Sequence, residues 1–558
     1  MSTLRGAAAQ AHHKINRRGF ITGAAAIGIS AYEASLGLAY TGLVAAAGSS
    51  RSADAAAMQT LVVAAYDTPQ NLDTQKTVHL PSVEVVTGNL YDTLIQFKKK
   101  TNAQGLSEAD FSGFVPLLAE RWSVSADGKT WTFHLRKGVM SAAGNELTAN
   151  DVKWTWDRIY AVKGLGIFYY NTLKLRGPQA ITVKDRYTVA FHTDTPSSTF
   201  WDDQQQFATV IIDSTEAKKH ATQADPWATG WLAHHAAGFG PYVVSSWVPG
   251  QQMVLTARAN YYRGPARIKQ VIYKAVPDAS SRLALLINGA ADVAEDLSAQ
   301  QLAIVRTAAG VKDNWWPGGS RIVGVEMNLA MKPFDDVRVR RAVSYATPYD
   351  AILSTVYLGK AARMKTVYPS SYPYATAQFN HYTLDYARAK SLLQQAGYPH
   401  GFTTTLSYNS GIPEEELIAV QMRSSLATVG INVLLDKQPP AIFTQKLQQK
   451  KFPFVIYPDQ PIAPDPGYAV YLYYVTGSLV NYTNYSNKEV DKLTFEGLAT
   501  LDPAKQRRIW TRVQQLITAD APWVWLAEPG FHLATRRNVH GATWYPINLI
   551  QFYDFYKA

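Results

Sequence analysis

The sequence predicts a mixed α/β fold built from open sheets, and three observations support this. Apolar residues make up 47% of the 558 residues and charged residues 17%, a balance typical of folded globular chains. Segments with the two-residue alternation of strands are interspersed with segments that have the apolar spacing of helices. No repeat or low-complexity linker divides the chain after its N-terminal stretch. Strands alternating with helices indicate βαβ units, and the lack of a linker indicates domains made of interleaved segments.

Composition also excludes several classes of function. The chain contains no cysteine, which excludes disulfides, thiolate metal sites and a cysteine nucleophile. The net charge is +11, but no dense basic stripe appears beyond short runs such as 98–100 and 338–341. Nucleic-acid binding needs a focused basic face, so we expect no nucleic-acid partner. Aromatic residues reach 12%, a share that can line a pocket as well as fill a core.

The N-terminal stretch has the pattern of an export signal. Residues 14–22 read KINRRGFIT and precede a weakly apolar segment rich in Ala and Gly. Arg17 and Arg18 in this context resemble the twin-arginine export signal. An uncleaved membrane anchor is the alternative, but Glu33 inside the apolar segment argues against it. We therefore assign residues 1–57 to the signal and adjoining stretch, and we expect the remainder in the periplasm.

The first half of the remaining chain gives several local predictions. Residues 60–66 form a short buried strand, and residues 131–136 alternate as a half-buried strand does after a turn at 127–128. Thr148 begins a helix with Asp151 three residues on, a weak capping box.

Two more segments carry strand patterns. Residues 183–191 alternate and indicate a strand, and residues 241–255 indicate two strands around Pro249-Gly250.

The second half has clearer helix signals. Three helices are predicted: one after Asp335-Asp336, one from Asp385 to Gly397, and one from Pro413 to Gly430. Strands are predicted at 323–329, 402–408, 431–435 and 454–457.

The catalytic motifs that we tested are absent from the sequence. There is no G-x-S-x-G and no H-E-x-x-H. His234-His235 could hold a soft metal, but adjacent strand residues point to opposite faces and no third ligand lies nearby in the sequence. We expect neither an enzyme nor a cofactor or metal site.

A long and specific resemblance then appears. The stretch PLLAERWSVSADGKTWTFHLRKGV (116–139), followed by GNELTANDVKWTWDRI (144–159), resembles the family 5 extracellular solute-binding proteins of bacterial peptide and nickel ABC importers. Further blocks follow in the family's order: GFGPYVVSSWVPGQQMVL (238–255), residues 260–293, KPFDDVRVRRAVSYA (332–346), DYARAKSLLQQAGYPHGF (385–402) and YSNKEVDKL (485–493). The resemblance spans nearly the whole chain after the signal.

The resemblance implies a two-lobed periplasmic binding protein of type II, with an extra subdomain in lobe one and a hinge between the lobes. It maps lobe one to 58–320 plus 530–558 and lobe two to 321–529. It implies a monomer that captures a peptide-like or other amine-bearing solute and delivers it to an ABC permease and its ATPase. The alternative is a stand-alone exported receptor or chaperone, and an exported enzyme is a third possibility.

The resemblance also implies where ligand is bound. In peptide-binding relatives an Asp after the strand matching 454–457 pairs with the ligand's amino terminus. Asp459, which follows Tyr457, matches this position, and a desolvated carboxylate–ammonium pair is strong. Asp465 is the competitor because the loop is longer than usual. Both aspartates could instead only cap the helix that follows.

A second loop departs from the family's pattern. Dipeptide binders carry an Arg after the strand matching 402–408, whereas this loop reads NSGIPEEEL and begins at Asn409. The glutamates suit the first turn of a helix. Arg321 could supply a carboxylate contact instead, with Asn328 on the next strand as a cleft or hinge contact. We therefore expect a ligand with a cationic amine and no required carboxylate.

Overall fold

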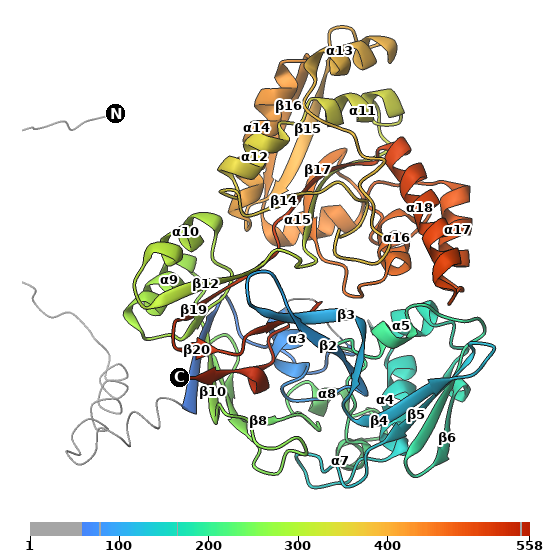
Figure 1. Ribbon diagram of the computed structural model, residues 1–558, viewed down its shortest axis with the longest axis vertical. Coiled ribbons are helices and arrows are strands. Elements are labelled where there is room, and N and C mark those ends of the chain that lie inside the picture. The colour runs from blue at the N-terminus through green and yellow to red at the C-terminus, as the bar shows by residue number, and fades with distance from the viewer. Residues whose placement is uncertain (1–58, 77–79, 165, 547–548) are drawn as a thin grey trace, which may run out of the picture. The chain divides into compact units, whose positions relative to one another are not determined.

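The computed structural model describes residues 59–76, 80–164, 166–546 and 549–558 (Figure 1). The predicted export signal, with Arg17 and Arg18, lies outside the described residues. Two large sheets, of seven and six strands, organise the described chain. We call lobe one the described residues that build the seven-stranded sheet and the three smaller sheets, and lobe two those that build the six-stranded sheet. The mixed α/β architecture confirms the predicted fold class.

The seven-stranded sheet of lobe one has the strand order β12-β19-β11-β1-β10-β9-β8. Its strands are β1 (Thr60–Ala65), β8 (Tyr242–Val248), β9 (Gln252–Ala257), β10 (Gln270–Ala275), β11 (Val293–Ala294), β12 (Val311–Trp316) and β19 (Phe531–Arg536). β1 runs parallel to both β10 and β11, so the carboxyl ends of these three strands share one edge. The strand predicted at 60–66 and the two strands around Pro249-Gly250 are confirmed.

Three smaller sheets complete lobe one, with the orders β4-β5-β7-β6, β2-β3-β21 and β20-β22. Their strands are β2 (Ile95–Thr101), β3 (Ser107–Pro116), β4 (Ala119–Val124), β5 (Thr130–Leu135), β6 (Ile181–Asp185), β7 (Thr188–His192), β20 (Val539–His540), β21 (Thr543–Trp544) and β22 (Tyr556–Lys557). The single strand predicted at 183–191 is wrong, because a hairpin divides it. The carboxylate of Asp185 accepts the N–H of Tyr187 at 2.8 Å, and such a turn reverses the chain.

The six-stranded sheet of lobe two has the order β14-β18-β13-β17-β15-β16. Its strands are β13 (Ile322–Met327), β14 (Ala362–Arg363), β15 (Phe402–Asn409), β16 (Ile431–Gln438), β17 (Phe454–Asp459) and β18 (Trp523–Glu528). β15 is parallel to β16 and β17, and β13 is antiparallel to β17 and β18. The four predicted strands are confirmed, although β17 runs on through Asp459, in the segment expected to be a loop.

Helices cover the sheets of both lobes. Lobe one contains α3 (Leu80–Val86), α4 (Ala149–Val162), α5 (Ile167–Thr172), α6 (Phe200–Asp203), α7 (Ser214–Lys219), α8 (Thr229–Leu232), α9 (Ala279–Asn288) and α10 (Ala299–Thr307). Lobe two contains α11 (Val337–Tyr345), α12 (Tyr349–Thr355), α13 (Tyr386–Gln395), α14 (Pro413–Ala427), α15 (Pro440–Gln448), α16 (Pro466–Tyr474), α17 (Lys488–Leu498) and α18 (Pro503–Asp520). Within the described residues, no helix combines the length and the apolar character needed to cross a bilayer.

The predicted helix starts follow from capping side chains. Thr148 and Asp151 form a reciprocal capping box at α4. Asp336 and Asp385 accept backbone N–H groups at the starts of α11 and α13. Gly430, at φ 87°, follows the end of α14 in a conformation that favours glycine.

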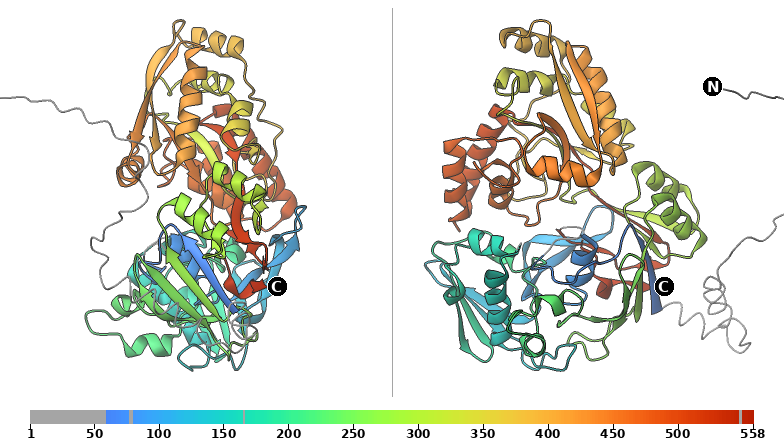
Figure 2. Two further views of the ribbon diagram at one scale, coloured as in Figure 1. Left: turned by 90° about the vertical axis from the view of Figure 1, so that its left-hand side faces the viewer. Right: turned by 180° about the vertical axis from the view of Figure 1, so that it is seen from behind.

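The chain crosses between the two large sheets twice. It leaves β12 at Trp316 and enters β13 at Ile322, and it leaves β18 at Glu528 and enters β19 at Phe531. β12 pairs with β19, and β13 pairs with β18, so the two crossings lie side by side (Figures 1 and 2). The indole N–H of Trp315 donates to the carbonyl of Pro529 at 3.4 Å and joins them.

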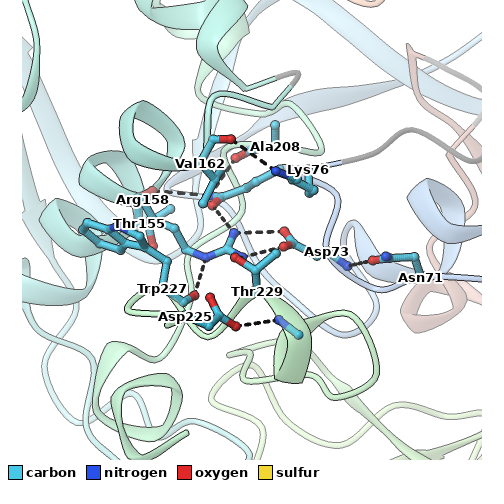
Figure 3. A network of polar contacts seen from close by, with 12 residues as sticks. Asn71, Asp73, Lys76, Thr155, Arg158, Val162, Ala208, Asp225, Trp227 and Thr229 are labelled. Carbon is cyan, nitrogen blue, oxygen red and sulfur yellow. Dashed lines mark hydrogen bonds and ion pairs between the residues drawn. The ribbon is translucent and has the colours of Figure 1, made fainter. Parts of the chain in front are cut away.

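A buried ion pair ties together three segments of lobe one (Figure 3). The guanidinium of Arg158, on α4, donates to Asp73 at 2.9 Å, to Gln75 at 2.7 Å and to the carbonyl of Trp227 at 2.9 Å. Both charged side chains are almost fully buried, at 0% and 2% exposure. Multiple hydrogen bonds of this kind satisfy the charges that folding removes from water.

Candidate ligand-binding site

Asp459 lies at the carboxyl end of β17, half-buried, and opposite Ile322 of β13. One carboxylate oxygen accepts the N–H of Gln460 at 2.7 Å. Burial raises the pKa of Asp459, while the facing hydroxyls of Tyr473 and Tyr457 and the positive charge of Arg321 oppose the rise. A partly desolvated carboxylate that faces hydroxyl groups is suited to hold an ammonium group.

Tyr457 lies two residues before Asp459 on the same face of the sheet. It is half-buried, and its ring packs edge-on against Tyr482 with centroids 5.2 Å apart. The pair forms an aromatic wall next to Asp459, as expected for a ligand-binding surface in an aromatic-rich chain.

Asp465 has a structural role in this structure. It begins α16 as the N-cap residue, and its carboxylate accepts the N–H of Tyr468 at 2.9 Å. Burial raises its pKa to about 6, although backbone N–H groups at the helix start oppose the rise. Asp465 therefore acts as a helix cap, whereas Asp459 caps no helix among the described residues.

Arg321 lies at the boundary between the two lobes in the sequence, and its charge acts on acidic residues of both lobes. It precedes β13 directly and is half-buried. Among the described residues its guanidinium has no hydrogen bond or ion pair. Burial raises the pKa values of Asp296 in lobe one and Asp459 in lobe two, and the positive charge of Arg321 opposes this rise. Arg321 thus carries a positive charge that acts on acidic residues of both lobes.

Glu415 is a residue that the sequence reasoning treated only as a first-turn charge. It does lie in the first turn of α14, but it is buried and accepts the N–H of Asn409 at 2.7 Å. Burial raises its pKa to about 8, and Arg321 opposes the rise. One of its oxygens has no partner. Because its N–H donates to Glu415, Asn409 lies next to this part of the site. Its own side chain accepts the N–H of Gly411 at 2.9 Å.

Asn328 does not join this group. It follows β13 at the end opposite to Arg321, separated by roughly 20 Å of extended chain. Its amide donates to the carbonyl of Lys450 at 3.0 Å, and its oxygen accepts from Ala330 at 3.1 Å and from Asn484 at 2.9 Å. These bonds fix neighbouring loops of lobe two, so the structure separates Asn328 from Asp459 and Arg321.

Lobe one contributes a second acidic edge that the sequence reasoning missed. Glu295 and Asp296 follow β11 directly, at the carboxyl ends of the parallel strands. The hydroxyl of Tyr273 donates to Glu295 at 2.8 Å and lies 3.1 Å from Glu84. Burial and the charge of Asp296 raise the pKa of Glu295 to about 8. The sequence did contain a signal for this acidic edge. Ligands bind beyond the carboxyl ends of strands in open α/β sheets, and two acidic residues follow β11 at that end.

The lobes contact each other near Asp459 and Asp465. The ring of Phe168 in lobe one packs against Tyr468 with centroids 5.5 Å apart. The amide of Gln206 donates to the carbonyl of Ile462 at 3.4 Å, and the N–H of Ser198 donates to the carbonyl of Leu498 at 2.9 Å. Both Gln206 and Ile462 line a cavity of about 40 Å³.

Metal-binding side chains do not gather in groups of three among the described residues. No three His, Cys, Asp or Glu side chains of the described residues are placed to hold a metal ion. His234 and His235 follow α8, and the side chain of His235 lies 3.0 Å from the carbonyl of Trp231. The polar groups at the contact are carboxylates, hydroxyls and one free guanidinium, which together can bind charged groups of an organic ligand.

Known proteins share both the sequence pattern and the fold. The model of the bacterial extracellular solute-binding proteins, family 5, middle part, matches residues 113–479. The probable D,D-dipeptide-binding periplasmic protein DdpA of Escherichia coli is 29% identical over 494 residues, which cover 87% of this chain and 92% of that protein. The glutathione-binding protein GsiB of Escherichia coli is 29% identical over 466 residues, covering 81% of this chain and 88% of GsiB.

A solved structure shows the same fold. The periplasmic binding protein DppA from Helicobacter pylori, in complex with the peptide STSA, superposes with a TM-score of 0.77 at 23% identity. The alignment covers 89% of this chain and 98% of that chain. Because the family model matches more than half of the residues, the resemblance seen in the sequence is confirmed, and the chain belongs to the bacterial extracellular solute-binding proteins of family 5.

Proposed function

We propose that this protein is the periplasmic solute-binding component of an ABC importer. It captures a peptide-like or other amine-bearing solute between its lobes and delivers it, as a monomer, to a membrane permease driven by an ATPase. Family membership supports this function, and the two relatives named above are described as binding D,D-dipeptides and glutathione.

The observation that carries the amine preference is the charge around Arg321. Asp459 and Glu415 from lobe two and Asp296 from lobe one all interact with this cation, and Asp296 also interacts with Arg282. Arg321 is therefore shared among several carboxyl groups, so it does not fully balance the charge of Asp459, and an added positive charge is favourable there. An ammonium group at Asp459 supplies that charge, and Arg321 remains able to pair with a carboxylate if the ligand has one.

We also propose that the two chain crossings act as the hinge. Residues 317–321 and 529–530 connect the sheets, which agrees with lobe boundaries at 58–320 plus 530–558 and at 321–529. Side-by-side connections allow a rotation of one lobe on the other, as in hinge closure around a ligand.

The amine anchor is tested by replacing Asp459 with a neutral residue of the same shape. The ligand that co-purifies is first identified by native mass spectrometry, and its affinity is then measured by calorimetry. We expect Asp459→Asn to weaken binding at least a hundredfold, because breaking a buried charge pair costs ~3 kcal/mol or more. Asp350→Asn, which changes an exposed aspartate of lobe two, serves as the matched control and should bind as the unchanged protein does.

Other outcomes would revise the anchor. If Asp465→Asn abolishes binding while Asp459→Asn does not, the amine lies at Asp465. If neither variant weakens binding, or if amidation of a ligand carboxylate abolishes it, the amine anchor is wrong and Arg321 becomes the main contact.

We propose that Arg17 and Arg18 direct export by the twin-arginine route. Their replacement together, Arg17→Lys with Arg18→Lys, should leave the protein unprocessed in the cytoplasm, because that pathway reads the arginine pair. Cell fractionation with immunoblotting measures this. Normal processing of the double variant would instead indicate the general secretory route.

A further inference from the structure

Three aspartates interact electrostatically where lobe one approaches the start of α16 of lobe two, near the ring contact of Phe168 with Tyr468. Asp202 and Asp203 end α6, and Asp465 begins α16. The charge of Asp465 raises the pKa values of both lobe-one aspartates, although burial is the larger cause. No basic side chain of the described residues forms a hydrogen bond or ion pair with any of the three. Acids from both lobes therefore influence each other electrostatically, and none of them is paired with a basic side chain of the described residues.

One carboxylate oxygen of Asp203 accepts hydrogen bonds, and the other has no hydrogen-bond partner. The side chain is fully buried. Its Oδ2 accepts the hydroxyls of Thr199 at 3.0 Å and Thr172 at 3.2 Å, whereas Oδ1 has no partner. A carboxylate that is oriented by two hydroxyl groups and keeps a free oxygen has the form of a prepared acceptor.

Other buried polar atoms nearby also lack partners. They are the hydroxyl of Tyr169 and the amide oxygen of Gln206. Gln206 reaches across to Ile462 of lobe two, and both line the same small cavity. Tyr169 faces Asp203 and Tyr468. Buried groups without partners carry a free-energy cost of ~1–3 kcal/mol each, so this set gains stability from any bound group that supplies hydrogen bonds.

The aspartates lie close to the proposed amine anchor. Tyr372 faces Asp202, Asp459 and Asp465, and Tyr468 faces both Asp203 and Asp459. These two tyrosines, each almost fully buried, thus form a wall shared by both places. The two places are therefore linked through the same two tyrosines.

We propose that Asp203 and Asp465 form a second cation-binding subsite, shared between the lobes, and that the ligand carries two cationic groups. The inference rests on the proposed function for the amine at Asp459 and adds an ammonium or guanidinium group at Asp203. The described residues offer no metal-binding set of three ligands, so the second cation is an organic group of the solute, such as the side chain of a basic peptide or the far end of a diamine.

Charge explains why the second cation would also hold the lobes together. Asp203 in lobe one and Asp465 in lobe two repel each other when both are ionised. Burial raises the pKa of Asp203 to about 8, and the groups that face it are Asp465, Asp202, Tyr169 and Tyr468. The carboxyl group is therefore protonated at neutral pH without ligand, and a bound cation displaces that proton.

The test compares two tripeptides that differ only in one charge. Lysyl-alanyl-alanine carries two cations, and norleucyl-alanyl-alanine lacks the side-chain ammonium. Calorimetry at pH 7 should show at least tenfold tighter binding of the lysyl peptide to the unchanged protein. Asp203→Asn should remove this preference and leave the affinity for the norleucyl peptide within a factor of about two. Asp185→Asn, which alters an exposed hairpin of lobe one, should keep the preference.

Proton release separates a binding role from a structural one. Titrations in buffers of different ionisation enthalpy should show release of a proton with the lysyl peptide but not with the norleucyl peptide, and no release from Asp203→Asn. If Asp203→Asn does not fold, Asp465→Asn gives the same comparison, because Asn also caps helices well. Equal affinities for the two peptides would overturn the second subsite and leave the amine anchor standing. If neither peptide binds, the amine-binding function is overturned together with this inference.

Discussion

At the scale of single residues, charges buried in this protein differ in whether the fold itself satisfies them. Arg158 and Asp73 have each other, and Arg158 also bonds to Gln75 and to the carbonyl of Trp227 (Figure 3). Glu415 and Asp203 each keep an oxygen without a partner. The ion pair is satisfied within the fold, whereas Glu415 and Asp203 each keep an oxygen that is able to accept a further hydrogen bond.

The buried pair gives a prediction about stability. Asp73→Asn leaves the Arg158 guanidinium buried without its counter-charge, so the free energy of unfolding should fall by ~3–5 kcal/mol. Asp157→Asn is the matched control, because it breaks the half-exposed Lys153–Asp157 pair on the same helix and should cost less than ~1 kcal/mol. Urea unfolding of both variants measures the difference. Equal losses would contradict this account of the ion pair.

At the scale of elements, the unit β15–α14–β16 depends on glycines at its turns. Gly401 precedes β15 at φ 77°, and a Cβ there would overlap the backbone carbonyl of Gly430. Gly397, which follows α13 at φ 89°, has no other atom within 4 Å of where a Cβ would lie. The two glycines share a left-handed conformation and differ in how closely another segment approaches.

This contrast allows backbone strain to be separated from packing. Gly397→Ala should cost ~1–2 kcal/mol through its positive φ alone. Gly401→Ala should cost at least ~1 kcal/mol more, because β15 must also move away from the turn before β16. Urea unfolding of the two variants gives both values. A Gly401→Ala variant as stable as Gly397→Ala would show that the turn adjusts without loss.

Local signals explain which elements the sequence predicts well. Capping residues and apolar spacing predict α11, α13 and α14, because each depends only on a few neighbouring residues. The alternation over residues 183–191 predicts one strand where the structure has two, because both arms of a hairpin alternate and only Asp185 marks the turn. The site is harder. Asp459 follows from the family pattern, but Asp203 and Asp296 gain their importance from segments distant in sequence, which single-sequence reasoning does not bring together.

At the scale of the whole molecule, several buried acids make stability depend on pH. Burial is the main cause that raises the pKa values of Asp203, Glu295 and Glu415 to about 8. These groups hold protons in the folded state that the unfolded chain releases near pH 4. Their contribution to stability is therefore complete below pH 4 and is lost as pH rises through about 8.

We expect the free energy of unfolding of the ligand-free protein to fall by about 2 kcal/mol or more between pH 5.5 and pH 8.5. Carboxyl groups with lowered pKa values, such as Asp336, stabilise the folded state only above about pH 4 and add no change in this range. Urea unfolding at pH 5.5, 7 and 8.5 tests the prediction. Stability that rises with pH over this interval would contradict the protonated state of these acids.

The place of β19 in the seven-stranded sheet has a consequence for synthesis on the ribosome. β19 lies between β12 and β11, so the sheet of lobe one stays divided until residues 531–536 have been translated. At a translation rate of about 5–20 residues per second, residues 531–536 are synthesised roughly 10–40 s after β12. Lobe two is divided in the same way until β18 joins β14 to β13, and its sheet is complete at Glu528, only eight residues before β19 ends at Arg536. Both sheets of the nascent chain should therefore close almost together, at the end of synthesis.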